Sequence, residues 1–315
     1  MDCDYIQFYV YLHSIFFYRT IRVHPNVVNT IVLKFIRPVL ALTLLVLGST
    51  GATLSHSAGS VSDPDFAREM IAGAHSPEEK GLAVFSAADR LNSGYQDLQV
   101  QLKMILLSAK GSRTERALRI QQFEVEDDGD KVLVVFDLPA SIRGTALLSH
   151  AHIDGADDQW LFLPALKRTK KIASRNKTGP FVGSEFSFED LSPQEVEKYD
   201  YRYIGEEQID DTPCYVVDRM PRDQYSGYSR QRVWLDQTAL RIQKIDFYDR
   251  AENHAKQLVV DGYQLYNEQF WKPAFMRMDN LRTRKSTELH WDNYLFAAGL
   301  DEARDFSVNS LRRAR

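Results

Sequence analysis

Apolar and polar residues alternate in short runs along most of the chain between Tyr95 and Phe296. Each run ends at a turn signal, and the pair Asp128-Gly129 is typical of a hairpin. Because successive side chains of a strand point to opposite faces of a sheet, each run predicts a strand with one apolar face. We expect strands at residues 98–106, 113–126, 132–136, 145–153, 159–164, 168–173, 199–208, 214–219, 229–236, 240–249, 254–266, 271–280 and 284–296.

These runs follow one another through short connections, without the alternation of strands and helices that a doubly wound α/β fold requires. The pattern therefore predicts a mainly β chain of the α+β class, with a single curled antiparallel sheet that forms a half-open barrel. No internal repeat or low-complexity linker divides the runs, so we expect one domain over residues 59–315. The apolar face of such a sheet must be covered, and what covers it, protein or ligand, is the functional question.

Two short amphipathic helices are predicted before the first strand. Asp63-Pro64 supplies an N-cap followed by proline, and Ser76 with Glu79 has the spacing of a capping box. A third, brief helix is expected from Ser192 to about Lys198. The apolar residues that the first two helices place on one side are Phe66, Met70, Ile71, Ala74, Leu82, Phe85 and Leu91.

Two longer segments interrupt the strands. Residues 174–190 are polar and contain glycines and aromatic residues, and we expect them to cross between two halves of the sheet. Residues 220–228 form the second segment. Long loops at the rim of a sheet often gate a cavity. A simple connecting role for both segments is the alternative.

The first sixty residues differ from the rest. Lys34 and Arg37 precede an apolar run at 39–47, and small residues follow at 48–52. This order is typical of a secretory signal peptide, and the core is shorter than the roughly 18–20 residues of a spanning helix. We interpret residues 1–58 as a signal peptide with an upstream extension from a misplaced start codon; a second, amphipathic membrane segment is the alternative. The exported chain is expected to be a soluble, periplasmic monomer.

Charge and cysteine content exclude few classes. The net charge of −4 gives no indication of a nucleic-acid partner, and none is expected. Cys3 and Cys214 are the two cysteines, so cleavage of the signal peptide leaves no pair for an intramolecular disulfide. The fold must then depend on its apolar core for stability.

One short segment invites a catalytic interpretation. His150, His152 and Asp154 alternate along a predicted strand and would share one face, where they could hold zinc. The simpler interpretation is an exposed strand face before an Asp-Gly turn. Cys214 enters an apolar strand and is interpreted as a buried hydrophobic residue. Because the chain has no nucleophile elbow and no phosphate-binding glycine loop, we expect no enzymatic activity, no metal and no cofactor.

A basic cluster lies near the middle of the chain. In an exported protein such a cluster can contact lipid head groups or an acidic partner. Because the basic residues alternate with Leu166, Thr169 and Ile172, a solvated strand face explains them equally well. The residues assigned to this partner or membrane surface are Lys167, Arg168, Lys170 and Lys171.

An incompletely covered apolar face would bind hydrocarbon. Transfer from water is worth roughly 0.8 kcal/mol for each methylene, so a single acyl chain provides ample gross binding energy. Ordinary core packing is the alternative for each apolar position. The residues expected to line an acyl-chain site are Leu98, Val100, Leu102, Met104, Val134, Phe136, Leu161, Leu163, Phe66, Met70, Leu82 and Phe85.

Two motifs resemble a known family. Residues 158–168, DQWLFLPALKR, and residues 181–191, FVGSEFSFEDL, look like the outer-membrane lipoprotein-sorting family of LolA-like proteins, in its longer branch associated with transporters of the resistance-nodulation-division type. The similarity runs from about Phe66 to about Phe306 and includes Trp234-Leu235-Asp236 and Trp271-Lys272-Pro273. It implies a periplasmic half-barrel of about eleven strands, covered by helices, with a cavity for acyl chains.

Three functional hypotheses follow. The first is a periplasmic carrier or accessory protein that binds lipoprotein acyl chains or another lipid for transfer toward the outer membrane, with an inner-membrane transporter and an outer-membrane acceptor as partners. The second is a non-catalytic interaction module that scaffolds an inner-membrane transporter. The third is a metal-dependent hydrolase at His150, His152 and Asp154.

Overall fold

The computed structural model describes residues 64–314, so the predicted signal peptide and extension at 1–58 lie outside the described residues. Thirteen antiparallel strands form one sheet in the order β6-β5-β4-β3-β2-β1-β15-β14-β11-β10-β9-β8-β7. The strands are β1 (Asp97–Leu107), β2 (Arg113–Phe123), β3 (Lys131–Leu138), β4 (Ala146–His150), β5 (Asp158–Leu163), β6 (Arg168–Ile172), β7 (Tyr199–Ile209), β8 (Thr212–Pro221), β9 (Tyr228–Asp236), β10 (Ile242–Asp249), β11 (His254–Asp261), β14 (Phe275–Asn280) and β15 (Lys285–Phe296).

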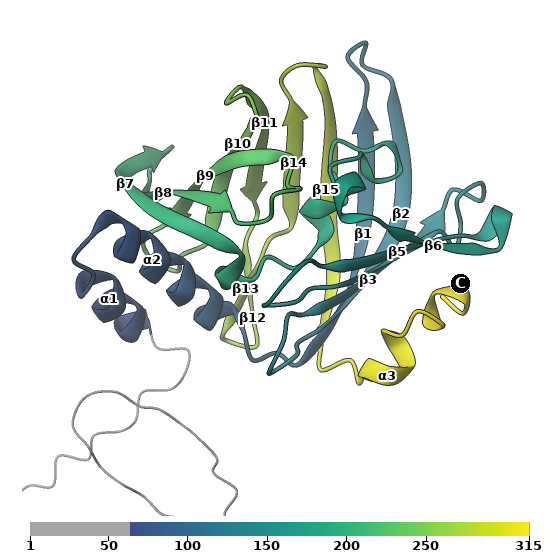
Figure 1. Ribbon diagram of the computed structural model, residues 1–315, viewed down its shortest axis with the longest axis horizontal. Helices are drawn as coiled ribbons and strands as arrows, with labels where there is room; N and C mark the ends of the chain where they lie inside the picture. Colours follow the sequence, from purple (N-terminus) through teal and green to yellow (C-terminus); the bar gives the residue numbers. More distant parts are fainter. Residues whose placement is uncertain (1–63, 315) are drawn as a thin grey trace, which may run out of the picture. The chain divides into compact units, whose positions relative to one another are not determined.

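The sheet is curled and open, as predicted, with β6 and β7 as its unpaired edges in the described part of the chain (Figure 1). It consists of two meanders, β1 to β6 and β7 to β15, which join where β1 pairs with β15. The segment between β6 and β7 must therefore run from one edge of the sheet to the other. This confirms the prediction that residues 174–190 cross between two halves of the sheet.

The alternation of the sequence separates the two faces of the sheet. Leu98, Val100, Leu102 and Met104 of β1 belong to one large apolar cluster on the concave face. That cluster also takes in residues of the helices and of the crossing segment 173–198. The period of two that predicted the strands therefore also predicted the buried side of β1.

Two helices cover one end of the concave face, α1 (Pro64–Ala72) and α2 (Pro77–Asn92). The predicted capping box is present, because Glu79 N–H donates to Ser76 Oγ while the Glu79 carboxylate accepts from the Ser76 N–H. A Cβ on Gly81 would lie 2.9 Å from the backbone nitrogens of Arg202 and Tyr203. Gly81 therefore lets α2 approach the backbone of β7 closely.

Two predicted strands are each divided in the structure. Residues 254–266 form β11 and then β12 (Gln264–Tyr266), and residues 271–280 begin in β13 (Phe270–Lys272) and continue in β14. Gly262 has a φ of +66°, which turns the chain between β11 and β12. The prediction of two continuous strands is thus wrong, because β12 and β13 leave the main sheet and pair with each other. The third predicted helix is a single 3₁₀ turn at Val196–Lys198.

The convex face of β3 to β5 has its own cover. After β15 the chain forms α3 (Glu302–Asp305) and a 3₁₀ turn at Ser310–Arg312. Phe306 and Leu311 are buried there against Leu133, Leu148 and Phe162. This C-terminal cover was not predicted, because the segment is too short to show helical periodicity.

Candidate ligand-binding site

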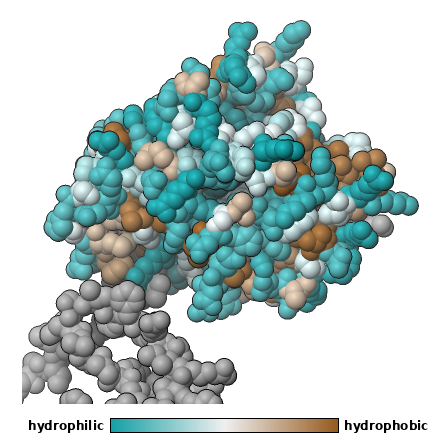
Figure 2. Space-filling view, viewed as in Figure 1, coloured by the Kyte–Doolittle hydropathy of each residue, from teal (hydrophilic) through white to brown (hydrophobic). Residues whose placement is uncertain are grey.

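A cavity of about 400 Å³ lies between α2 and the concave face of β8 to β14. Sites for small molecules span roughly 300–1,000 Å³ and are predominantly apolar, so the volume suits a single-chain ligand. The surface seen in Figure 2 is mainly hydrophilic, with hydrophobic residues in separate groups. The apolar residues that line the cavity are Phe85, Ala88, Phe186, Val196, Leu235, Leu240, Ile242, Ile245, Phe247, Leu258, Val260, Tyr263, Trp271, Pro273, Met276 and Met278.

The cavity lies in a different half of the sheet from most of the residues that sequence analysis selected. Of those twelve residues, Phe85 of α2 lines it. Met70 is partly buried against the concave cluster, whereas Phe66 and Leu82 are 38% and 47% exposed. Leu163 is half-buried at the end of β5. The remaining selected residues on β1, β3 and β5 pack in the concave cluster: Leu98, Val100, Leu102, Met104, Val134, Phe136 and Leu161.

The crossing segment packs against the concave face of the β1 to β3 half. The Phe181 ring stacks on Phe136 with 5.5 Å between centroids, and Phe188 packs edge-on against Phe181. The segment is also held by hydrogen bonds, since Arg116 Nη1 donates to the Val182 carbonyl at 2.6 Å. The N–H of Glu185 donates to Thr287 Oγ1 at 3.0 Å. Aromatic side chains of this segment therefore plug that half of the sheet.

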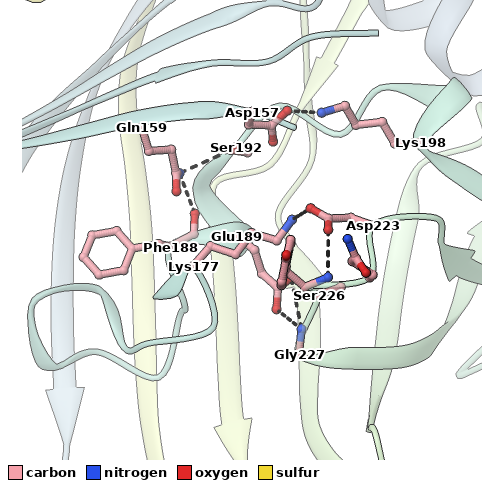
Figure 3. A network of polar contacts seen from close by, with 12 residues as sticks. Asp157, Gln159, Lys177, Phe188, Glu189, Ser192, Lys198, Asp223, Ser226 and Gly227 are labelled. Carbon is pink, nitrogen blue, oxygen red and sulfur yellow. Dashed lines mark hydrogen bonds and ion pairs between the residues drawn. The ribbon is translucent and has the colours of Figure 1, made fainter. Parts of the chain in front are cut away.

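The two long loops that sequence analysis proposed as gates are bound to each other (Figure 3). Lys177 of the first loop forms an ion pair with Asp223 of the second. Glu189 accepts from the Gly227 N–H at 3.0 Å, and burial raises the pKa of Glu189. A polar cleft of about 680 Å³ lies beside this junction and includes Lys198, which pairs with Asp157. The loops thus form one fastened rim in the structure.

An acidic pair lies where the crossing segment meets the β2–β3 turn. The N–H of Asp130 donates to Glu195 Oε1 at 2.9 Å. Burial raises the pKa of Glu195 to about 7 and that of Asp130 to about 6. Asp130 also accepts from Gln122 Nε2 and from the Val125 N–H. This pair ties the turn to the segment that leads into β7.

His150, His152 and Asp154 do not form a common site. His150 is the last residue of β4, so the later two residues leave the strand and the predicted shared face is wrong. His150 Nε2 lies 2.7 Å from the Phe306 carbonyl oxygen, and His152 Nδ1 lies 2.7 Å from Asp128 Oδ2. Within residues 64–314, no group of three or more histidine, cysteine, aspartate or glutamate side chains is arranged to hold a metal ion. Each histidine is instead engaged in a local structural contact.

Cys214 is fully buried, as its place in an apolar strand predicted. Burial raises the pKa of its thiol to about 11, so the thiol is protonated at neutral pH. A protonated, inaccessible thiol is a poor nucleophile, and this argues against covalent chemistry at Cys214.

The predicted basic surface lies along the edge strand β6. Lys167 precedes the strand with a φ of +49°, and Arg168 and Lys170 are exposed on it. Lys171 is exposed too, and it forms an ion pair with Asp158. The four cations therefore occupy one edge of the sheet. Across residues 64–314, none of the helices has the length and apolar character needed to cross a membrane.

Comparisons with known proteins extend this description. A family model described as an uncharacterized protein matches residues 128–313. No curated protein matches the chain. A crystal structure from Vibrio parahaemolyticus, described as an outer membrane lipoprotein-sorting protein domain, is 44% identical, with 75% of this chain and 100% of that chain covered and a TM-score of 0.73.

Two further structures share the fold. A DUF1329 family protein from Desulfovibrio piger is 26% identical, with 75% of this chain and 100% of that chain covered and a TM-score of 0.71. A LolA superfamily protein from Nitrosomonas europaea is 18% identical, with 73% and 98% covered and a TM-score of 0.59, and it shows the fold alone. The chain therefore belongs to the outer membrane lipoprotein-sorting family, as its motifs predicted.

Proposed function

We propose that this protein is a periplasmic carrier that holds a lipoprotein acyl chain or another lipid in the cavity beneath α2. The observation that carries the proposal is the combination of about 400 Å³ of space and a wall of aliphatic and aromatic side chains. Each methylene moved from water into such a site contributes roughly 0.8 kcal/mol before ordering costs are subtracted. The description of the Vibrio parahaemolyticus relative as a lipoprotein-sorting domain supports the same role.

Transfer toward the outer membrane requires contact with donor and acceptor surfaces. The exposed cations Lys167, Arg168 and Lys170 on the β6 edge suit anionic head groups or an acidic face of a membrane partner. We propose that this edge faces the inner-membrane transporter or the outer-membrane acceptor during transfer. Neither step requires chemistry on the cargo, so we propose a non-catalytic protein.

Ligand binding is tested with two matched tryptophan substitutions on one strand. Leu258 lines the cavity, whereas the adjacent Val259 is 37% exposed on the other face of β11. Leu258→Trp should fill the cavity and abolish binding of a fluorescent fatty acid, and Val259→Trp should leave binding unchanged. Native mass spectrometry of the purified protein should also show copurified lipid. A wild-type protein that carries no lipid and binds no fatty acid would contradict the proposal.

The second candidate is an interaction module that scaffolds an inner-membrane transporter of the resistance-nodulation-division type. The unpaired, basic β6 edge favours it, because exposed edge strands are ready surfaces for partners. The carrier requires an open cavity, whereas the scaffold requires the basic β6 edge, so variants at these two places distinguish the two functions in cells. Loss of the cellular phenotype on reversing the charges of Arg168 and Lys170, with retention in Leu258→Trp, would favour the scaffold over the carrier.

A further inference from the structure

Five charged side chains line the mainly apolar cavity, and three of them have hydrogen-bond partners. Arg219 Nε donates to Gln231 Oε1 at 2.7 Å. Arg241 Nε donates to Asp236 Oδ2 at 2.8 Å. Asp190 accepts from the Tyr228 hydroxyl at 3.0 Å. The remaining two are Asp89 and Lys272.

Lys272 is the unpaired cation of this cavity in the described part of the chain. It is half-buried on β13, and its Nζ lies 4.6 Å from the centre of the Tyr95 ring. Its ammonium has no hydrogen bond or ion pair to another described residue. Burial lowers its pKa to about 8, against the influence of Glu124 and Asp130. Lys272 is therefore mostly cationic at neutral pH without an anion to bind.

The carboxylates near Lys272 form hydrogen bonds with other groups. Glu124 accepts from the N–H groups of Gly94 and Gln96, and Asp130 accepts from Gln122. Asp89 lines the cavity from α2 and is not among the groups that influence the pKa of Lys272. Burial and the nearby Glu197 and Glu124 raise the pKa of Asp89, and no cation is among the groups that act on it. A cation held in a partly desolvated site gains strongly from an anionic partner supplied from outside.

We propose that Lys272 binds the anionic head group, a carboxylate or a phosphate, of a single-chain amphiphile whose hydrocarbon tail fills the cavity. This inference rests on the proposed carrier function and defines its ligand class. The tail contacts the aliphatic wall of β9 to β14, while the head group accepts charge-assisted hydrogen bonds from Lys272 Nζ. Trp271 and Pro273, which flank Lys272 in the sequence, line the same cavity. The arrangement selects a charged lipid over a neutral one of equal length.

The test compares three ligands with the same tail: hexadecanoate, hexadecyl phosphate and hexadecanol. Their dissociation constants are measured by isothermal titration with the wild-type protein and with Lys272→Met, Lys272→Arg and Lys244→Met. Lys244 is the matched control, because its Nζ lies 3.5 Å from the Trp234 ring centre but it does not line the cavity. The Arg variant keeps the charge and tests rescue.

We expect the wild-type protein to bind at least one of the two anions roughly tenfold or more tightly than hexadecanol. Lys272→Met should remove that preference while binding hexadecanol as before, whereas Lys272→Arg and Lys244→Met should retain it. The anion that is preferred identifies the head group. Equal binding of all three ligands by the wild-type protein would overturn the role of Lys272 and leave the carrier function standing. Binding of none would overturn both.

Discussion

The two halves of the sheet share one sequence pattern but have different interiors. On the β1 to β6 side, the crossing segment stacks Phe181 on Phe136 of the concave face and packs Phe188 against Phe181. On the β8 to β14 side, α2 covers strands of the same alternating type and leaves about 400 Å³ open. Alternation therefore determines which side chains point to the concave face. The covering segment determines whether these side chains are closely packed or line a cavity.

The sequence of α2 explains the open half. Gly81 lets α2 lie close against the backbone of β7, which is one edge of the sheet. Farther along the helix, Ala88 lines the cavity, and its side chain is too small to fill the gap. A close-packed interior requires bulky partners on both sides, and α2 supplies one, Phe85.

Matched phenylalanine substitutions should give the largest difference between the halves. Phe136 and Phe247 are both buried, and each contacts one aromatic ring, Phe181 and Tyr228 respectively. Phe136→Ala should lower the free energy of unfolding by about 3–5 kcal/mol, because a close-packed site loses contacts on every side. Phe247→Ala should lower the free energy of unfolding by about 1–2 kcal/mol less, because Phe247 borders the cavity and its ring contacts fewer neighbouring atoms.

Urea denaturation of the two variants measures this difference. Equal losses would mean that the cavity is collapsed in solution, and the contrast between the halves would then fail. The slope of unfolding with urea should stay constant, which confirms that the variants differ in stability and not in the extent of unfolding.

A second substitution tests whether α2 is a fixed cover or a loosely docked lid. In an exposed helix, Gly→Ala stabilises by up to about 1 kcal/mol through helix propensity. At Gly81 the added methyl would lie 2.9 Å from two backbone nitrogens of β7, so Gly81→Ala should instead destabilise by about 1–3 kcal/mol. Thermal or urea unfolding gives the sign. A gain in stability would mean that α2 is not held against β7, and the open half would then have a movable wall.

The sequence predicts which strand residues are buried, but not which half of the sheet holds the cavity. Leu98, Val100 and Met104 were correctly expected on one buried face, because period-two alternation is a local property of a strand. Whether these residues line a ligand site cannot be judged from the strand sequence alone. The ring that covers this half, Phe181, comes from a segment distant in the sequence. The motif around Phe181 was noticed for its family resemblance, and its packing role depends on the strand order that brings it across the sheet.

The strand end that separates His150 from His152 and Asp154 is not visible in the sequence pattern. Alternation continues through that segment, but β4 stops at His150, and His152 contacts Asp128 of the β2–β3 turn instead. Lys272 was quoted as part of a motif without a role. Its lack of an anionic partner is a tertiary property, because it depends on what Glu124 and Asp130 bind.

The smallest effect is expected at the junction of the crossing segment with the β2–β3 turn, where Glu195 contacts Asp130. The pKa of Glu195 is about 7 in the folded protein against 4.5 for an ordinary glutamate, so the folded state binds more protons than the unfolded state between these values. By linkage, the free energy of unfolding should fall as pH rises from about 4.5 to about 7, and the same holds for Asp130 up to about 6. Ionised Glu195 thus weakens the junction.

Glu195→Gln should flatten this part of the pH profile and stabilise the protein at pH 8 by about 1 kcal/mol, a modest value because partial exposure of Glu195 screens the effect. The glutamine carbonyl can still accept from the Asp130 N–H, so the substitution removes charge and keeps the contact. Glu69→Gln, on the exposed side of α1, is the control and should leave the profile unchanged. The prediction would be wrong if wild type and Glu195→Gln gave the same stability curve from pH 4 to 8. Ionisation of Glu195 would then have no effect on the free energy of unfolding.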